Sequence, residues 1–260
     1  MSQEPLLRQE EKGVVVLTLN RPEVMNSLNF EMLHALWEQI KALRFRSDIR
    51  VIIITGAGEK AFSAGADLKE RTTLRDVQVR EFITTIRDLF TAIENLNQPV
   101  IAAVNGVALG GGTELALAGD IRIAAENASM GLTETRLAII PGGGGTQRLP
   151  RLVGRSKAKE MIFTGSRVSA AEALNIGLVN RVCPQDALLD EARTMAAMIC
   201  ETGPVAVAQA KYAINKGMET DINTGLAIES NAYWMTIPTQ DRLEGLAAFR
   251  EKRKPVYTGQ

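Results

Sequence analysis

The sequence predicts an alternating α/β fold, and three observations support this prediction. Short apolar runs typical of strands recur along the first half of the chain. Segments whose apolar residues repeat with helical spacing lie between these runs. The chain has 260 residues, of which 45% are hydrophobic, so it can bury the core of one large domain or of one domain with an appendage. Strands and helices are therefore expected to alternate around a common core.

Four segments have the pattern of strands. They cover residues 14–19, 51–55, 100–104 and 120–124. The third is the clearest, because it follows Pro99 and ends shortly before Gly106. Proline and glycine mark the ends of regular elements, so we expect this run to form a buried strand.

Two helices are predicted in the same half of the chain. Residues 30–40 place a set of apolar side chains on one face, namely Leu33, Leu36, Trp37 and Ile40. The single histidine of the chain, His34, is expected on the surface of this helix. A second helical pattern, around residues 80–96, has the spacing of one buried face. The polar segment 71–80 before it is expected to be mobile.

After about residue 181 the strand pattern disappears and helical patterns continue. Pro204 lies near the start of a helix that Gly217 can end. Thr239 marks the start of a final helix, which extends through residue 253.

We predict that the chain has two parts, residues 1–195 and residues 196–260. The second part is helical and carries a considerable apolar area at Tyr233, Trp234 and Met235. An apolar helical appendage packs on its own domain or buries surface on another subunit.

Composition is typical of a soluble enzyme. The 30 basic and 30 acidic residues give a net charge of zero, which is not typical of a protein that binds nucleic acid strongly. No apolar run approaches the roughly 18 to 20 residues that span a bilayer. The start, residues 1–11, is polar and acidic, and does not have the pattern of a secretory or transit peptide. We expect the bacterial cytosol, or the mitochondrial matrix only if a transit peptide is missing from the chain.

The two cysteines, Cys183 and Cys200, are too few for a disulfide framework or a zinc site, so we expect both to be reduced. The sequence also lacks a Cys/His cluster for a transition metal and a tight carboxylate cluster for calcium. A metal-free mechanism is therefore predicted.

Three glycines at residues 110–112 open an apolar run typical of a helix, and this run contains one isolated carboxylate, Glu114. The first N–H groups of a helix lack partners and lie at the positive end of its dipole, so they favour an anion. The motif predicts an oxyanion site with an acid/base group beside it. A packing turn followed by a solvated glutamate fits the motif alone equally well.

A second isolated carboxylate, Glu134, precedes the four consecutive glycines 142–145. Glycine adopts positive φ readily and lets the backbone approach a ligand or a bound water. A nucleotide-phosphate loop is the alternative, but the Lys-Ser/Thr ending and the Gly-x-Gly-x-x-Gly context are missing.

The third segment of interest, residues 60–71, follows the predicted strand at 51–55. Its small residues keep the backbone open, so its amides can face a ligand from the side opposite the glycines 110–112. Taken alone, the segment has the pattern of a turn into a helix.

Together these segments resemble the crotonase (enoyl-CoA hydratase/isomerase) family, and the resemblance extends from residue 19 to residue 253. The chain is most similar to the methylglutaconyl-CoA hydratase branch and its bacterial short-chain enoyl-CoA hydratase relatives. The segments that indicate this branch are residues 65–71, 137–151 and 236–245. The resemblance implies a spiral of ββα turns with the CoA and acyl site over residues 1–195, and a helical oligomerisation region over residues 196–260.

The resemblance also implies roles for individual residues. Glu114 and Glu134 correspond to the hydratase carboxylate pair, of which the first activates water and the second protonates the α carbon. Ala66 and Gly111 correspond to the two residues whose N–H groups form the oxyanion hole. Gly142 corresponds to a backbone position that helps to hold the water.

The same resemblance implies a coenzyme A thioester as substrate, with no prosthetic group and no metal. The bend that grips the adenine and pantetheine portions consists of Ala64, Gly65, Ala66, Asp67 and Leu68. Phe249 and Lys252 correspond to C-terminal positions that reach CoA, in some relatives across a subunit boundary. A homotrimer or a dimer of trimers is implied, and segment 71–80 borders the acyl pocket in relatives.

We therefore predict reversible hydration of a short-chain or branched 2-enoyl-CoA to a 3-hydroxyacyl-CoA, with 3-methylglutaconyl-CoA as one candidate. Water addition puts negative charge on the thioester oxygen, which two preorganised amides stabilise. Two carboxyls in a partly desolvated site need not both ionise, because burial and like charge raise at least one pKa.

Three alternatives stay open at this stage. Another crotonase-type reaction, such as enoyl-CoA isomerisation, uses the same enolate, although the presence of both glutamates favours hydration. Secondary RNA binding is known for a relative in this branch, and residues 44–50 offer a modest basic cluster. A catalytically silent scaffold is the third alternative, and the intact site residues argue against it.

Overall fold

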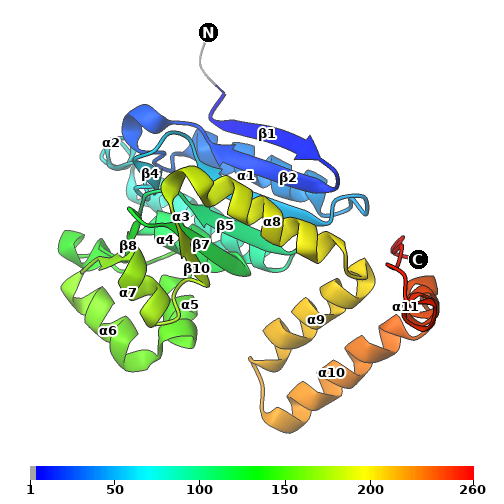
Figure 1. The fold of residues 1–260 in the computed structure, drawn as a ribbon. Coiled ribbons are helices and arrows are strands. Elements are labelled where there is room, and N and C mark those ends of the chain that lie inside the picture. The colour runs from blue at the N-terminus through cyan, green and yellow to red at the C-terminus, as the bar shows by residue number, and fades with distance from the viewer. Residues whose placement is uncertain (1–3) are drawn as a thin grey trace.

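The computed structural model describes residues 4–260 and contains two sheets (Figure 1). Residues 1–3, part of the polar start, lie outside the described residues. The larger sheet has the order β1-β2-β3-β5-β7-β10, with β1 (Leu6–Glu11), β2 (Val14–Leu19), β3 (Val51–Gly56), β5 (Val100–Val104), β7 (Ile121–Ala125) and β10 (Arg181–Cys183). The smaller sheet has the order β4-β6-β8-β9, with β4 (Ala61–Ser63), β6 (Val107–Leu109), β8 (Ser129–Gly131) and β9 (Val168–Ser169). The end strands β1 and β9 are antiparallel to their neighbours, and the other pairs are parallel.

Helices follow the strands in a regular succession. They are α1 (Phe30–Leu43), α2 (Leu68–Arg71), α3 (Asp76–Glu94), α4 (Gly111–Ala118), α5 (Gly145–Val153), α6 (Arg155–Thr164), α7 (Ala170–Asn175), α8 (Leu188–Cys200), α9 (Pro204–Gly217), α10 (Ile222–Thr236) and α11 (Gln240–Glu251), with 3₁₀ helices η1 (Pro22–Val24), η2 (Glu134–Leu137) and η3 (Gln185–Ala187). The pairs β3/β4, β5/β6 and β7/β8 each place one strand in each sheet before a helix follows. This succession is the spiral of ββα turns that the resemblance implies.

The hydrophobic core lies on both faces of the larger sheet. In β3, Ile52 and Ile54 belong to the cluster that includes side chains of α1, α3 and α4. Val51 and Ile53 belong to a second cluster, together with side chains of α8. Successive side chains of a strand point to opposite faces, so a strand covered on both faces is apolar throughout. This explains the continuous apolar run at residues 51–54.

The four predicted strands are confirmed as β2, β3, β5 and β7, although β7 begins at Ile121 rather than at residue 120. The helices predicted from residues 30, 204 and 239 are confirmed as α1, α9 and α11. His34 is exposed on α1 as predicted, and both cysteines are free. Sequence patterns did not reveal β1, which is largely exposed and polar. They also did not reveal β10 or the strands of the smaller sheet, which have only two or three residues each.

The helix predicted around residues 80–96 is confirmed as α3, although it begins earlier, at Asp76, and ends at Glu94. The Gln78 side chain accepts a hydrogen bond from the Arg75 N–H at 3.1 Å, which satisfies a donor that the helix leaves free. Asp76 lies in the first turn, where the helix dipole favours negative charge. The polar character of residues 76–80 therefore comes from a helix start.

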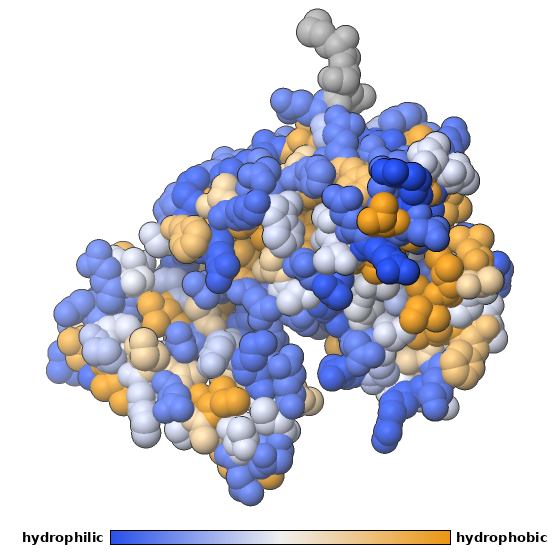
Figure 2. Space-filling view, turned by 180° about the vertical axis from the view of Figure 1, so that it is seen from behind, coloured by the Kyte–Doolittle hydropathy of each residue, from blue (hydrophilic) through white to orange (hydrophobic). Residues whose placement is uncertain are grey.

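Helices α9, α10 and α11, with the tail to residue 260, form what we call the C-terminal lobe (Figure 1). Lys211 on α9 anchors this lobe to the sheet, because its Nζ lies 2.7 Å from Asp120 Oδ2 and 3.1 Å from Gln98 O. Seen from behind, the lobe lies at the lower left and shows apolar side chains on its surface (Figure 2). They include Ile214, Met218, Ile222, Tyr233, Trp234, Met235 and Leu246.

The boundary predicted between residues 195 and 196 falls inside α8, which packs on β3, β5 and β7 and ends at Cys200. The division into two domains stays a prediction. Among the helices of residues 4–260, none is both long and apolar enough to cross a bilayer.

Candidate active site

Two glutamates from consecutive ββα turns lie close enough in the interior to affect each other's charge. Glu114 is in the first turn of α4 and is 2% exposed, and Glu134 begins η2 shortly after β8. The Thr113 hydroxyl donates to Ala108 O at 2.7 Å and accepts from the Gly131 N–H at 3.1 Å. These bonds hold α4 against β6 and β8, the strands that precede the two glutamates.

The glycines at the start of α4 are required by close contacts. Gly110 has φ +50°, and a Cβ built on it would lie 3.1 Å from Glu134 Oε1. A Cβ on Gly112 would overlap the carbonyl oxygen of Ser63 in β4. The helix start can therefore approach both Glu134 and the smaller sheet only because it lacks side chains.

The four-glycine loop holds Glu114. The N–H groups of Gly143 and Gly145 both donate to Glu114 Oε1 at 2.8 Å. A Cβ on Gly143 would lie 2.8 Å from Oε2, and one on Gly145 would lie 3.0 Å from Oε1. Within residues 4–260 no hydrogen bond to Oε2 is formed, so one carboxylate oxygen is held and the other is free to accept a proton.

The pKa values of Glu114 and Glu134 are both raised, but different neighbours act on each. Burial raises the pKa of Glu114, while the N–H groups of Gly145 and Gly143 and the charge of Arg148 oppose this rise. Burial, and then the negative charge of Glu114, raise the pKa of Glu134 to about 7. The two groups titrate as a pair. The pair therefore keeps a proton to higher pH than two isolated carboxyls would.

The backbone N–H groups of Ala66 and Gly111 lie near each other. A Cβ on Gly111 would lie 3.7 Å from Ala66 N, and one on Gly65 would lie 3.1 Å from Gly111 N. The backbone of Leu28 holds the bend at residues 64–68. Its carbonyl oxygen accepts from the Asp67 N–H and its N–H donates to Gly65 O, both at 2.8 Å. Among residues 4–260, neither the Ala66 nor the Gly111 N–H donates a hydrogen bond, so both are available to one acceptor.

The Asp67 side chain fixes the bend that carries Ala66. Its Oδ1 accepts from the Lys69 and Glu70 N–H groups at the start of α2, and its Oδ2 lies 2.9 Å from Arg21 Nη2. The side chain of Asp67 is 11% exposed, so this ion pair is largely shielded from water. Leu68, the next residue of the predicted CoA-binding bend, is 53% exposed.

The structure therefore brings together Glu114, Glu134, Ala66 and Gly111. Gly142, predicted to help hold water, lies beside the loop amides that bind Glu114, and a Cβ on it would lie 3.0 Å from Ile83. Two amides beside two carboxyls with raised pKa values can stabilise an oxyanion while a proton is taken up and another is released.

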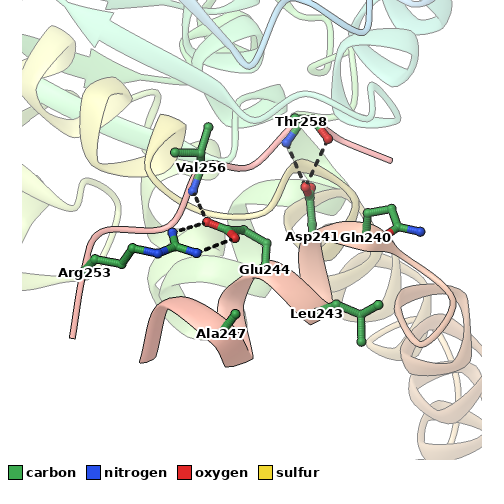
Figure 3. A pocket seen from close by; sticks show the side chains of 8 residues that line it. All are labelled: Gln240, Asp241, Leu243, Glu244, Ala247, Arg253, Val256 and Thr258. Atoms are coloured by element: carbon green, nitrogen blue, oxygen red, sulfur yellow. Dashed lines mark hydrogen bonds and ion pairs between the residues drawn. The ribbon is translucent and has the colours of Figure 1, made fainter. Parts of the chain in front are cut away.

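The structure does not bring Phe249 and Lys252 to these residues within one chain. Both lie at the end of α11, in the C-terminal lobe and away from α4 (Figure 1), and Phe249 is 87% exposed. An open pocket of about 590 Å³ lies beside α11 (Figure 3), and neither Glu114 nor Glu134 lines it. Asp241 and Glu244 line this pocket and hold the returning tail through hydrogen bonds from the main chain of residues 256–259.

Sequence reasoning missed which loop amides bind Glu114 and missed Arg148 entirely. The glycine run was the only signal for the loop. Arg148 lies in α5 and pairs with Glu94 at 2.7 Å, but these residues are 54 positions apart and no local pattern links them.

Among the described residues, no group of three or more His, Cys, Asp or Glu side chains is placed to hold a metal ion.

Residues 9–260 match the enoyl-CoA hydratase/isomerase family. The chain is 58% identical to a putative enoyl-CoA hydratase/isomerase of Bacillus subtilis, over 98% of each chain. It is 50% identical to the mitochondrial methylglutaconyl-CoA hydratase of Homo sapiens, over 98% of this chain and 76% of that protein. It is 45% identical to a crotonyl-CoA hydratase of Syntrophomonas wolfei, over 99% of each chain.

A solved structure of an enoyl-CoA hydratase from Bacillus anthracis is also similar. Its TM-score is 0.97 and its sequence identity is 52%, over 98% of this chain and 100% of that chain. The agreement extends to the C-terminal helices, because nearly all of both chains is superimposed.

Proposed function

The chain belongs to the enoyl-CoA hydratase/isomerase family, and we propose that Glu114 and Glu134 perform its chemistry. The protein is an enoyl-CoA hydratase, a carbon–oxygen lyase that adds water reversibly across the 2,3 double bond of a short-chain 2-enoyl-CoA. The product is a 3-hydroxyacyl-CoA. The observation that supports our assignment is a pair of N–H groups, of Ala66 and Gly111, that have no acceptor among residues 4–260 and lie beside two carboxyls with raised pKa values, that of Glu134 being about 7.

In the proposed mechanism the thioester oxygen accepts from the Ala66 and Gly111 N–H groups as it becomes enolate-like. Losing one such donor typically costs roughly 2.7 to 4 kcal/mol. Glu114 takes a proton from water through Oε2 while the water oxygen bonds to the β carbon. Glu134 gives its proton to the α carbon, so the substrate gains one water in total. The pair then returns to its starting state by passing one proton from Glu114 to Glu134, directly or through solvent.

The direct test mixes purified protein with crotonyl-CoA and follows the conjugated enoyl-thioester absorbance. We expect rapid loss of this absorbance, with a 3-hydroxyacyl thioester as the product. A 3-enoyl thioester would instead establish isomerisation, the alternative reaction of the same fold. If the absorbance does not change, the result would favour the third alternative, a catalytically silent scaffold.

We propose that the acyl group is short, with crotonyl-CoA and 3-methylglutaconyl-CoA as the two candidates. Both candidates come from relatives of this chain, because the named crotonyl-CoA hydratase is 45% identical to it and the named methylglutaconyl-CoA hydratase is 50% identical. The ratio of kcat/KM for the two thioesters measures the difference in transition-state stabilisation and decides between them.

We propose that a second copy of the chain completes the CoA site, in a homotrimer or a dimer of trimers. The bend at residues 64–68 would bind the thioester of its own chain, and Phe249 and Lys252 would reach CoA bound to a neighbour. The exposed apolar side chains of the C-terminal lobe (Figure 2) are the surface that such an assembly would bury.

The predicted basic cluster at residues 44–50 gives little support to RNA binding. Arg46 Nη2 pairs with Glu10 at 2.6 Å and also with Asp48, so part of its charge is neutralised within the chain. Strong phosphate binding needs basic side chains that are free to replace counterions. An RNA titration over a salt series tests the point, and we expect no steeply salt-dependent binding.

We propose a cytoplasmic location. The relatives from Bacillus subtilis and Syntrophomonas wolfei support it, whereas the human relative is mitochondrial by name.

The loop glycines offer a first test of the assigned base. Gly143→Ala is expected to lower kcat at least roughly tenfold, because the added Cβ meets both Glu114 Oε2 and the Phe90 ring and must displace the carboxylate. Gly203→Ala is the matched control, since its Cβ would have only an ordinary contact of 3.8 Å. Steady-state hydration of crotonyl-CoA measures both variants, and equal rates would contradict the role of the loop.

A further inference from the structure

Arg148 lies behind the loop that holds Glu114. Its Nη1 donates to Gly143 O at 2.8 Å, while the N–H of the same Gly143 donates to Glu114 Oε1. Gly144 has φ +108°, and a Cβ on it would overlap Arg148 Nη1, so the guanidinium reaches the loop only because this position is glycine. The guanidinium thereby fixes the orientation of a residue whose amide binds the carboxylate.

Glu94, the last residue of α3, holds Arg148 in this position. Its Oε2 accepts from Arg148 Nη2 at 2.7 Å and from Nε at 3.1 Å. The Arg148 side chain is 12% exposed and that of Glu94 is 37% exposed. A shielded guanidinium with two bonds to one carboxylate and a third to a carbonyl has little freedom to turn.

We propose that Arg148 is a positioning residue for the water-activating glutamate, and that Glu94 controls how much of the guanidinium charge acts on that glutamate. The inference rests on the proposed function, in which Glu114 is the base. It assigns two effects to one side chain. The first is geometric, through the Gly143 peptide, and the second is electrostatic, through the charge on Arg148.

The charged groups around Glu114 come from three elements. Helix α5 contributes Arg148, η2 contributes Glu134, and α3 contributes Glu94 through its pair with Arg148. The side chains of α3 that lie beside the glycines of the loop, Ile83 and Phe90, are uncharged. Strands β4 and β6, which also pack on α4, consist of apolar residues and one serine. Arg148 is therefore the cation that acts on Glu114, and its charge opposes the rise in the pKa of that carboxyl.

The sign of each effect follows from these charges. Glu114 works as a base only when ionised, so its pKa sets the acidic limb of the kcat/KM profile. Arg148→Met removes the cation, and we expect the acidic limb to move to higher pH by about half to one unit. Glu94→Gln leaves the cation without its counter-charge, so the limb moves to lower pH. Arg148→Met also loses the bond to the loop, and kcat at the optimum falls roughly ten- to hundredfold, with a smaller change in KM.

The experiment measures kcat and kcat/KM for crotonyl-CoA from pH 5 to 9 in the wild type, the two variants and Arg151→Met, with circular dichroism to confirm folding. Arg151 is one turn further along α5, donates to Gln147 O and is exposed, so its variant should follow the wild type. Opposite shifts for Arg148→Met and Glu94→Gln support the proposal. Superimposed profiles, or shifts in the same direction, overturn it.

Two results distinguish a failure of this inference from a failure to fold and from a failure of the proposed function. If Arg148→Met fails to fold, the shift of the folded Glu94→Gln variant still decides the electrostatic effect. If the proposed function is wrong, the wild type itself does not hydrate crotonyl-CoA. Failure of the inference alone leaves an active wild type whose pH profile does not respond to the Arg148–Glu94 pair.

Discussion

Replacing either Glu114 or Glu134 by glutamine is expected to lower kcat for hydration roughly 10²- to 10⁴-fold. Glutamine keeps the size and hydrogen-bonding shape of the side chain but neither takes nor gives a proton at neutral pH. Glu114→Gln can still accept the Gly143 and Gly145 N–H groups through its amide oxygen, so the loop should keep its place. Steady-state rates with crotonyl-CoA measure the loss.

The matched control is Glu126→Gln, because Glu126 is exposed at the end of β7 and outside the site. Its rate should equal that of the wild type. Near-native turnover in both Glu114→Gln and Glu134→Gln would reject the proposed mechanism. Near-native turnover in only one of them would show that a single carboxyl does both proton transfers.

Glu134→Gln is also expected to change how the free energy of unfolding depends on pH. Burial and the charge of Glu114 raise the pKa of Glu134 from 4.5 to about 7, so the folded state binds a proton that the unfolded state releases. Stability from this group is therefore present at low pH and is lost as the pH rises from about 4.5 through about 7. Glu134→Gln removes this dependence, and denaturant titrations at pH 5 and pH 8 should differ less for the variant than for the wild type.

Lys211→Met is expected to lower the free energy of unfolding by about 3 to 5 kcal/mol, the usual cost of removing one partner of a buried ion pair. The Lys211 side chain is 8% exposed and its Nζ lies 2.7 Å from Asp120 Oδ2. Without Lys211 the Asp120 carboxylate keeps only the Val100 N–H, at 2.7 Å, as a close partner. Urea denaturation at fixed protein concentration measures the change.

A surface lysine on the same helix provides the control. Lys216 pairs with Glu219 at 3.7 Å and is 37% exposed, so Lys216→Met should change the free energy of unfolding by less than about 1 kcal/mol. Burial raises the pKa of Asp120 and Lys211 opposes the rise, so the loss in Lys211→Met should be larger at pH 8 than at pH 5. Equal stability of the Lys211→Met and Lys216→Met variants would show that this ion pair does not anchor the C-terminal lobe.

Much of the fold follows from local patterns in the sequence. Residues 100–104 were predictable as a buried strand because Pro99 and a following glycine delimit a run that is apolar on both faces. The predicted site residues include Glu114, Glu134 and the glycines beside them, and the structure places these residues close together. Here the family resemblance added the roles, whereas the residues alone left a solvated glutamate equally open.

The misplaced start of α3 and the missed short strands both arise because local sequence patterns do not distinguish the alternatives. Asp76 starts α3 through polar residues that cap a helix, and polar residues also make mobile loops, so composition does not separate the two. The short strands β4, β6 and β8 are too brief to show a period, and they exist because each pairs with a neighbour in the smaller sheet.

The sequence by itself determined the succession of strands and helices and the positions of the glycines, because side-chain period and backbone freedom are local properties. Only the tertiary structure decided that Gly143 and Gly145 bind Glu114, about 30 positions away in the chain, and that Arg148 is held by Glu94, 54 positions away. Contacts of this kind arise when separately predictable elements pack together. The charge of each glutamate is therefore a property of the packed fold, since it depends on burial and on neighbours that no stretch of sequence contains.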